Sequence, residues 1–511
     1  MAAAPGADAR QDRHDGGRQA PGLGVELPGI DRFPLWRQAR RTAVLGTSMS
    51  GKSTFLTSLL DWIMRADGAI EESVAGKSIW HVERLPPFEQ EGGFPLQSYR
   101  EDCLGNQLWP DKTVAASEFR FRFWRQSEGL RSLLDPYVAE EHLFVDLPGE
   151  RVADFSMANR GYAEWSDAVL DEIRSRRPYQ AFARDYLELV DRDQVTLTEG
   201  EIVTAYKTVL ARFARRLLPL VTPSTFLVED HGLYPKTGDP APYEMSVEEH
   251  LARAICGLDP SSEFVPLPVS ARTANGALAR CFEQRYDAYR RRIVDPLATG
   301  FYACDRLLIL VDVAAILEGG PAVYHSTRRS LRMAIEYLDP GMPGGRRLAN
   351  LVARLLTGGR LGDSKVGEVA LIATKADCVH RLDRANLTAL LEQMTRDLFA
   401  DAVHRGWLTP TYLACAAVEA TSSDDEYPYL NGWLARDPTL PDVLEYRRFP
   451  VSKLPMAWPA EDAWNPSAHR FAQVWPPKLN LLGDRPFPGI NMERVAELVG
   501  WGRLTTRPHR D

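Results

Sequence analysis

A run of small residues around one lysine is the part of this sequence best suited to chemistry. Residues 46–53 read Gly-Thr-Ser-Met-Ser-Gly-Lys-Ser and match the pattern G-x-x-x-x-G-K-[ST]. Glycines let successive backbone N–H groups curl around a polyanion where a side chain would clash. The pattern predicts a phosphate-binding loop, in which Lys52 brings charge to the β and γ phosphates and Ser53 binds Mg²⁺. Further nucleotide contacts are predicted for Gly46, Ser48, Ser50, Gly51 and Thr54.

A second candidate site residue ends an apolar stretch. Residues 142–149 read His-Leu-Phe-Val-Asp-Leu-Pro-Gly, which places Asp146 where a phosphate-loop protein holds its Mg²⁺ shell. Gly149 would let a backbone amide approach a γ-phosphate, and Glu150 follows it. The residue after the aspartate is not Glu, so the Asp-Glu pair of ATP-driven machines is absent. The predicted catalytic set is Lys52, Asp146, Gly149 and Glu150.

Thr113 is a further candidate for the magnesium site. It lies four residues before a predicted strand and could add a second hydroxyl ligand from a switch loop. A solvated loop threonine is an equal alternative.

A third motif concerns the base. Thr374-Lys375-Ala-Asp377 follows the apolar stretch 369–373. A carboxylate at Asp377 can accept two hydrogen bonds from guanine that adenine cannot donate. The stem of Lys375 could lie along the base, although such an aspartate is also a common helix N-cap.

The next strand end carries small residues. Cys415 and Ala416 could let backbone amides reach the guanine O6, or could simply pack the strand. Asp312 similarly ends the strand 307–311 and could cap a helix.

Strands and helices alternate around these motifs. Apolar strands are predicted at 41–46, 142–146, 306–311, 368–373 and 411–416, and a half-wet strand at 117–124. Helices are predicted from about 52 and at 205–218, 277–295, 326–337, 346–357 and 383–404. Buried strands that alternate with helices imply an α/β fold with a mainly parallel sheet covered on both faces.

The chain is too long for one core, because domains seldom exceed about 250–300 residues. We expect a disordered tail at 1–30, two parts of a P-loop core at 31–150 and 301–420, a helical insertion at 151–300 and a wrapping segment at 421–511. Residues 66–112 are expected to be rich in loops, and the segment after 420 to be irregular with a helix near 491–499.

Composition restricts the class of protein. A net charge of -8 argues against a general nucleic-acid binder. No stretch reaches the roughly 18 apolar residues of a membrane span. The six cysteines form no CxxC pair, which is typical of a protein from the reducing cytoplasm.

The motifs, in this order, resemble those of the P-loop GTPase superfamily. Together with Asp305 to Asp312, the Trp109-Pro110 pair and the segment Phe487-Pro-Gly-Ile-Asn491, they resemble the YcjX-like family of bacterial proteins. The resemblance implies a stress-associated nucleoside triphosphatase with a GTPase-like core and a helical insertion. It also implies a small membrane partner of the YcjF type, and hence a cytoplasmic protein that could be recruited to the inner membrane face.

The sequence thus predicts a Mg²⁺-dependent switch that binds GTP or GDP. Slow hydrolysis is expected, because Glu150 stands where a water-orienting Gln is common and Ser48 where an arginine finger favours Gly. One alternative is an ATPase of the same fold, with Asp377 only a structural cap. Another is a nucleotide-stabilised scaffold with little turnover.

Overall fold

The computed structural model describes eighteen separate parts of the chain. They are residues 38–46, 50–65, 79–86, 93–110, 117–126, 137–147, 154–155, 157–158, 160–192, 198–215, 222–224, 260–295, 298, 304–336, 368–405, 408–437, 440–477 and 487–501. Internal contacts divide the chain into residues 1–37 and 38–511, and every described residue belongs to the second unit. The predicted tail at 1–30 and the predicted helix at 346–357 lie outside the described residues.

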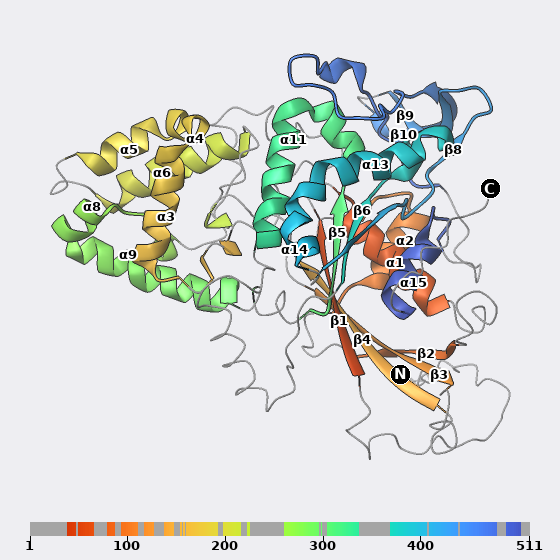
Figure 1. Ribbon diagram of the computed structural model, residues 1–511, viewed down its shortest axis with the longest axis horizontal. Coiled ribbons are helices and arrows are strands. Elements are labelled where there is room, and N and C mark those ends of the chain that lie inside the picture. Colours follow the sequence, from red (N-terminus) through yellow and green to blue (C-terminus); the bar gives the residue numbers. More distant parts are fainter. Residues whose placement is uncertain are drawn as a thin grey trace, which may run out of the picture. The chain divides into compact units, whose positions relative to one another are not determined.

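The core of the described structure is a seven-stranded sheet in the order β2-β3-β4-β1-β5-β6-β7 (Figure 1). β1 pairs in parallel with β4 and β5, and the parallel pairing continues through β6 to β7. β3 pairs antiparallel with β4, and β2 at the edge of the sheet pairs antiparallel with β3. The strands are β1 Gln38–Gly46, β2 Ile79–Leu85, β3 Ser117–Gln126, β4 Tyr137–Leu147, β5 Arg306–Val311, β6 Glu368–Ala373 and β7 Pro410–Ala414. The prediction of a mainly parallel α/β sheet is confirmed.

The central strands β4, β1, β5 and β6 contribute side chains to two cores, because successive side chains point to opposite faces. In β5, Leu307, Ile309 and Val311 pack in the cluster that contains residues of α11 and α13, while Leu308 and Leu310 pack against α1 and α15. α11 spans Val313–Glu336, α13 Arg384–Thr395, α1 Lys52–Arg65 and α15 Met492–Trp501. Burial on both faces explains why β5 is apolar from Leu307 to Val311.

β3 shows the contrasting pattern of a strand with one polar face. Its phenylalanines at 119, 121 and 123 are buried. Between them Arg122 donates to Glu141 of β4 at 2.7 Å and to Glu83 of β2 at 3.2 Å. The predicted alternation is therefore confirmed, and ion pairs to both neighbours occupy the polar face.

Residues 160–295 are helical wherever the structure describes regular elements. The helices are α3 Tyr162–Ser175, α4 Arg177–Phe182, α5 Arg184–Asp191, α6 Glu199–Arg215, α8 Val269–Ala274 and α9 Gly276–Tyr289, with short turns η7 Pro260–Ser262 and η8 Arg290–Val294. Buried tyrosine hydroxyls satisfy loop carbonyls among them: Tyr162 donates to Val265 O at 2.7 Å and Tyr206 to Thr222 O at 2.8 Å. The predicted helical character of this region is confirmed for these residues.

Three expectations were wrong. The supposedly loop-rich stretch 66–112 contains β2 and α2 Leu96–Gly105. The supposedly irregular segment after 420 forms a second sheet, with β8 Thr421–Ser423, β9 Tyr429–Asp437 and β10 Leu440–Pro450 in antiparallel order β10-β9-β8. α11 begins at Val313, well before the predicted start at 326.

Each error has a physical reason. β2 is an edge strand of mixed polarity, so its periodicity is weak. β9 does alternate, burying Leu430, Gly432 and Leu434, but proline and tryptophan around it conceal the pattern. Gly320, with a φ of 76°, and Pro321 kink α11 and hide its first turns.

Among the described residues, no helix has both the length and the apolar composition that crossing a membrane requires.

Candidate nucleotide-binding site

The phosphate-loop pattern lies at the carboxyl end of the central strand. β1 ends at Gly46 between β4 and β5, and α1 begins at Lys52. Gly51 adopts a φ of +75°, which favours glycine, and its carbonyl accepts the first helical bond from Phe55 N at 2.8 Å. A Cβ on Gly46 would come within 2.3 Å of Ser50 Oγ. The backbone of Gly51 therefore favours glycine, and a side chain at Gly46 would require Ser50 to move. The positive end of a 14-residue helix faces the loop.

Not all of the loop is described. Thr47, Ser48 and Met49 lie outside the described residues, so the predicted role of Ser48 stays a prediction. Thr113, Gly149 and Glu150 also lie outside them. Thr54 is half-buried in the first turn of α1.

Lys52 and Asp146 face each other across the strand ends. Asp146 lies near the end of β4, in register with Val44 of β1. Its carboxylate is 1% exposed, and Oδ1 lies 2.5 Å from Nζ of Lys52. A buried charge needs a counter-charge, so this pair compensates both groups when no polyanion is bound. The same proximity brings together the two residues that the sequence assigns to phosphate and to Mg²⁺.

The oxygen atoms here suit a magnesium ion. Neither carboxylate oxygen of Asp146, nor Ser50 Oγ, accepts a hydrogen bond of normal geometry from the described residues. Ser53 is nearly buried, one residue after Lys52. Mg²⁺ prefers such hard oxygen ligands and takes only one or two from the protein, with phosphate and water oxygens completing its shell. Ser53 and Asp146 thus fit the ion, although no cluster of three or more His, Cys, Asp or Glu side chains occurs in the described part of the chain.

Lys375 lies between the residues predicted to bind the base and those predicted to bind the phosphates. It follows β6, has a left-handed backbone with a φ of 58°, and pairs with Asp312 at 2.7 Å. A methyl group on Gly51 would lie 3.9 Å from its Cε, so the lysine stem runs past the phosphate loop. Burial alone would lower the pKa of Lys375, but the acidic groups around it, Asp312 foremost and then Cys378 and Asp377, together raise it. The lysine is therefore held charged with its stem along the loop.

Asp312 is the residue whose place in the site the sequence did not resolve. Its Oδ1 accepts from Ala315 N at 2.9 Å and caps α11, while Oδ2 holds Lys375. The helix-cap alternative is thus confirmed, and the cap has a second task. Asp312 follows β5, which lies between β1 and β6, and this position could have predicted its contact with Lys375 after β6.

Asp377 is a buried acid. It is 4% exposed, and Oδ2 accepts a hydrogen bond from Ala420 N at 3.1 Å. The hydroxyl of Thr421 donates to its backbone carbonyl. Burial raises the pKa of Asp377 to about 6, although the Ala420 amide opposes the shift. Asp377 lies inside the short turn η9 Ala376–Cys378 and Lys375 holds the N-cap position, so Asp377 is not the N-cap of that turn.

Thr374, Cys415 and Ala416 lie beside this acid. Thr374 is buried, and its amide donates to Val311 O at 3.0 Å. β7 ends at Ala414, two residues earlier than expected. The amide of Cys415 donates to Ala373 O at 2.9 Å and that of Ala416 to Ile490 O at 3.1 Å. Both amides are committed to other carbonyls, so a base contact from either one stays a prediction that requires a rearrangement.

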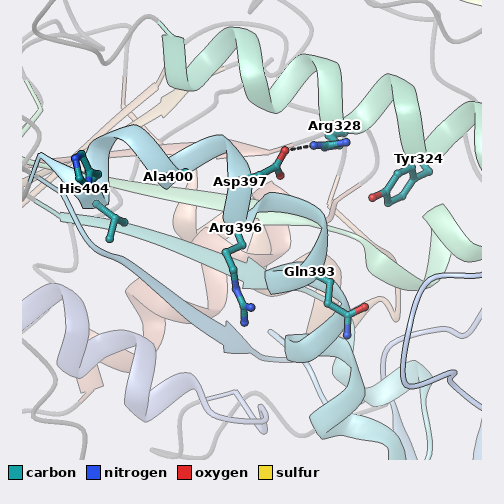
Figure 2. Close-up of a pocket in the computed structure, with 8 residues that line it drawn as sticks. Tyr324, Arg328, Gln393, Arg396, Asp397, Ala400 and His404 are labelled. Carbon is teal, nitrogen blue, oxygen red and sulfur yellow. Dashed lines mark hydrogen bonds and ion pairs between the residues drawn. The ribbon is translucent and has the colours of Figure 1, made fainter.

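A hollow of about 710 Å³ lies elsewhere, between α11 and the stretch from α13 to α14 Ala400–His404 (Figure 2). Arg328 on its rim pairs with Asp397, and Arg396 pairs with Glu392 at 2.7 Å. The other lining residues are Tyr324, Gln393, Ala400, Val403 and His404. None of the predicted nucleotide residues lines this hollow, and both of its arginines are neutralised.

A mostly parallel sheet flanked by helices, with a glycine-rich loop between its central strand and α1, defines an α/β protein with a core of the P-loop GTPase type. The chain belongs to the YcjX-like family, DUF463, whose sequence pattern matches residues 40–245 and 254–500.

Two curated relatives bear the name "Ras-like GTPase YcjX". The protein from Escherichia coli strain K12 is 24% identical over 505 residues, which cover 92% of this chain and 96% of the relative. The protein from Shewanella oneidensis is 23% identical over 405 residues, which cover 75% and 77% of the two chains.

Proposed function

We propose that this protein binds GTP and GDP with Mg²⁺ and hydrolyses GTP slowly, as a stress-linked regulatory switch. The observation that carries the proposal is the position of Lys375. Its stem runs past Gly51 of the phosphate loop, its ammonium is fixed on Asp312, and Asp377 follows two residues later with a buried carboxylate. The residues proposed to bind the phosphates and the residue proposed to read the base thus lie at neighbouring strand ends, where ligands of open α/β sheets bind, and this supports the proposal.

The chain's own residues have separate tasks in this proposal. Lys52 leaves Asp146 and neutralises the β and γ phosphates, while the amides at the start of α1 bind phosphate oxygens. Ser53 and the freed Asp146 hold Mg²⁺, which supplies positive charge to the phosphate oxygens when bound. Asp377 accepts the two guanine N–H groups, and a base that cannot donate both leaves the carboxylate short of partners.

Contacts beyond the second loop support a switch. Asp154 is fully buried and accepts hydrogen bonds from Ser224 N at 2.8 Å and from Tyr289 OH at 2.7 Å. Tyr286 donates to Met157 O and Arg160 O at 3.2 and 3.0 Å. The segment that follows Asp146–Glu150 is therefore tied to the helices of the 151–300 region. If the 146–150 loop becomes ordered around a γ-phosphate, these hydrogen bonds would transmit the change to the helices.

Slow turnover rests on Glu150, since a second negative charge near a γ-phosphate is unfavourable. The cytoplasmic location and the partner of the YcjF type rest on the family resemblance. The rival readings are an ATPase of the same fold and a scaffold with scarcely any turnover.

The first test is equilibrium binding of GTP, GDP, ATP and XTP, with Mg²⁺, to the full chain and to Asp377→Asn. We expect the wild type to prefer GTP over ATP. The variant should lose GTP affinity and gain XTP affinity, because its amide N–H can donate to the xanthine O2 where the carboxylate is repelled. Equal binding of ATP and GTP by the wild type would favour the ATPase reading.

The switch is tested separately by hydrogen exchange. With a GTP analogue rather than GDP, exchange in residues 154–165 should slow, and identical exchange would remove the coupling from the proposal.

A further inference from the structure

The segment before the last helix is attached to the loop that follows β7. Ile490 and Ala416 exchange both backbone hydrogen bonds, at 2.9 and 3.1 Å, and Glu419 N donates to Pro488 O at 2.6 Å. The side chain of Asn491 donates to Ala414 O at 2.8 Å. Residues 487–491, called here the clasp, thus run antiparallel along residues 414–419.

The sequence of the clasp is shaped for this contact. A Cβ on Gly489 would lie 2.8 Å from Ala416 O, a backbone atom that cannot move aside cheaply. Asn491 has a φ of 58°, a conformation that asparagine tolerates better than most residues. Phe487 is buried with Val418 of the same loop and with Cys103 of α2. The clasp therefore holds the loop by the Asn491 side chain, by backbone hydrogen bonds of Ile490 and Pro488, and by the buried Phe487 ring.

The held loop leads directly to Asp377. Ala420 donates its amide to the Asp377 carboxylate, and Thr421 donates to the Asp377 carbonyl. No more than six residues separate these donors from the clasped Ala414. A change in the conformation of the 414–419 loop would therefore displace the Ala420 amide and the Thr421 hydroxyl that orient Asp377.

The clasp also connects with the phosphate end. Immediately after it, α15 packs on α1: Met492, Val495 and Val499 share a buried cluster with Phe55 and Leu59. α1 carries Lys52 and Ser53 in its first turn. The C-terminal segment 487–501 thus contacts both α1, which carries Lys52, and the 414–419 loop, which leads to the partners of Asp377.

We propose that the clasp is the positioning element for base selection, with Gly489 and Asn491 as its positioning residues. The inference rests on the proposed function, in which Asp377 reads guanine. A carboxylate discriminates between bases only if its oxygens are held to within about 0.5 Å of the donor positions. The clasp supplies this constraint from more than a hundred positions away along the chain, without touching the nucleotide.

The test compares GTP with ITP, which lacks the exocyclic amine of guanine and differs in no other atom that Asp377 would contact. Binding of both, with Mg²⁺, is measured on the full chain for the wild type, Asn491→Gly, Gly489→Ala and Gly200→Ala. Asn491→Gly keeps the backbone conformation and removes only the bond to Ala414 O. Gly200→Ala is the matched control, because a Cβ there meets nothing within 4 Å.

We expect the wild type to prefer GTP, and the ratio of GTP to ITP affinity to fall about 10-fold in Gly489→Ala and about 3-fold in Asn491→Gly, as loss of one well-placed hydrogen bond implies. Gly200→Ala should keep the wild-type ratio. ITP affinity should fall less than GTP affinity, because hypoxanthine keeps the N1–H donor but has no exocyclic amine whose hydrogen bond could be lost.

Three outcomes would overturn the inference: unchanged ratios in both clasp variants, equal weakening of GTP and ITP, or a wild type that binds the two nucleotides equally. If Gly489→Ala does not fold, Asn491→Gly decides alone. Failure of the proposed function is seen separately, as a wild type that binds ATP as well as GTP.

Discussion

The two ends of the candidate site are built differently. At the phosphate end, residues 46–53 are contiguous in the chain. Asp146, from a different strand, pairs with Lys52 of this run. At the base end, Asp377 depends on Ala420, on the loop after β7 and, through it, on residues 487–491. Phosphate recognition uses backbone amides of one turn, which local geometry can fix. Base recognition needs a buried side chain, which only packing from several segments can hold in place.

The largest expected effect is at the phosphate end. Lys52→Ala removes the charge from the phosphates, and should lower GTP and GDP affinity about 100-fold, as for a charge-assisted hydrogen bond. It should also destabilise the nucleotide-free protein, because Asp146 is left buried without its cation. Calorimetric titration and thermal unfolding measure both effects. Wild-type affinity in a folded Lys52→Ala protein would contradict the assignment of the loop.

An intermediate effect is expected from the buried acid at the base end. The pKa of Asp377 rises from 3.8 to about 6, so the folded state favours the protonated form. The associated stability is fully present below pH 3.8 and is lost as the pH rises through about 6, a cost on the order of 2–3 kcal/mol at pH 7.5. Asn keeps an oxygen for the Ala420 amide but carries no charge.

Nucleotide-free Asp377→Asn should therefore be more stable than the wild type at pH 7.5. The difference should narrow as the pH falls through 6 toward 4. Urea unfolding at several pH values measures it, and a variant that is less stable at every pH would show that the burial of this carboxylate is not costly. A more stable variant at pH 7.5 would show that the proposed base-reading acid lowers the stability of the nucleotide-free protein, unlike the paired charges at the phosphate end.

The smallest effect is expected where the two ends meet. Lys375→Met keeps the stem beside Gly51 and removes the charge that pairs with Asp312. Because the lysine side chain is 40% exposed, water screens the pair, and the loss of stability should stay below about 1 kcal/mol. GTP affinity should fall about 5-fold, with ATP affinity changed less. A fall as large as in Lys52→Ala would mean that Lys375 contacts phosphate rather than supports the base.

The elements that the sequence predicted correctly have strong local patterns, and those that it did not predict have weak ones. The apolar runs of β1, β5 and β6 and the helix predicted from about residue 52 rest on local patterns, and all of them were confirmed. The edge strand β2 and the sheet β8–β10 were missed, because edge and surface strands are only partly buried and their patterns are weak.

The sequence by itself determined the phosphate loop, the strand ends that carry Asp146 and Asp377, and the family. These depend on residue types within a few positions of one another, which fix a turn, a strand or a helix start. The tertiary structure alone decided that Lys52 pairs with Asp146, that Asp312 holds Lys375 and that residues 487–491 lie against 414–419. The partners in these contacts are between 63 and 94 positions apart in the chain, and no local propensity specifies them; they are set when the parallel strands bring their carboxyl ends to one edge of the sheet.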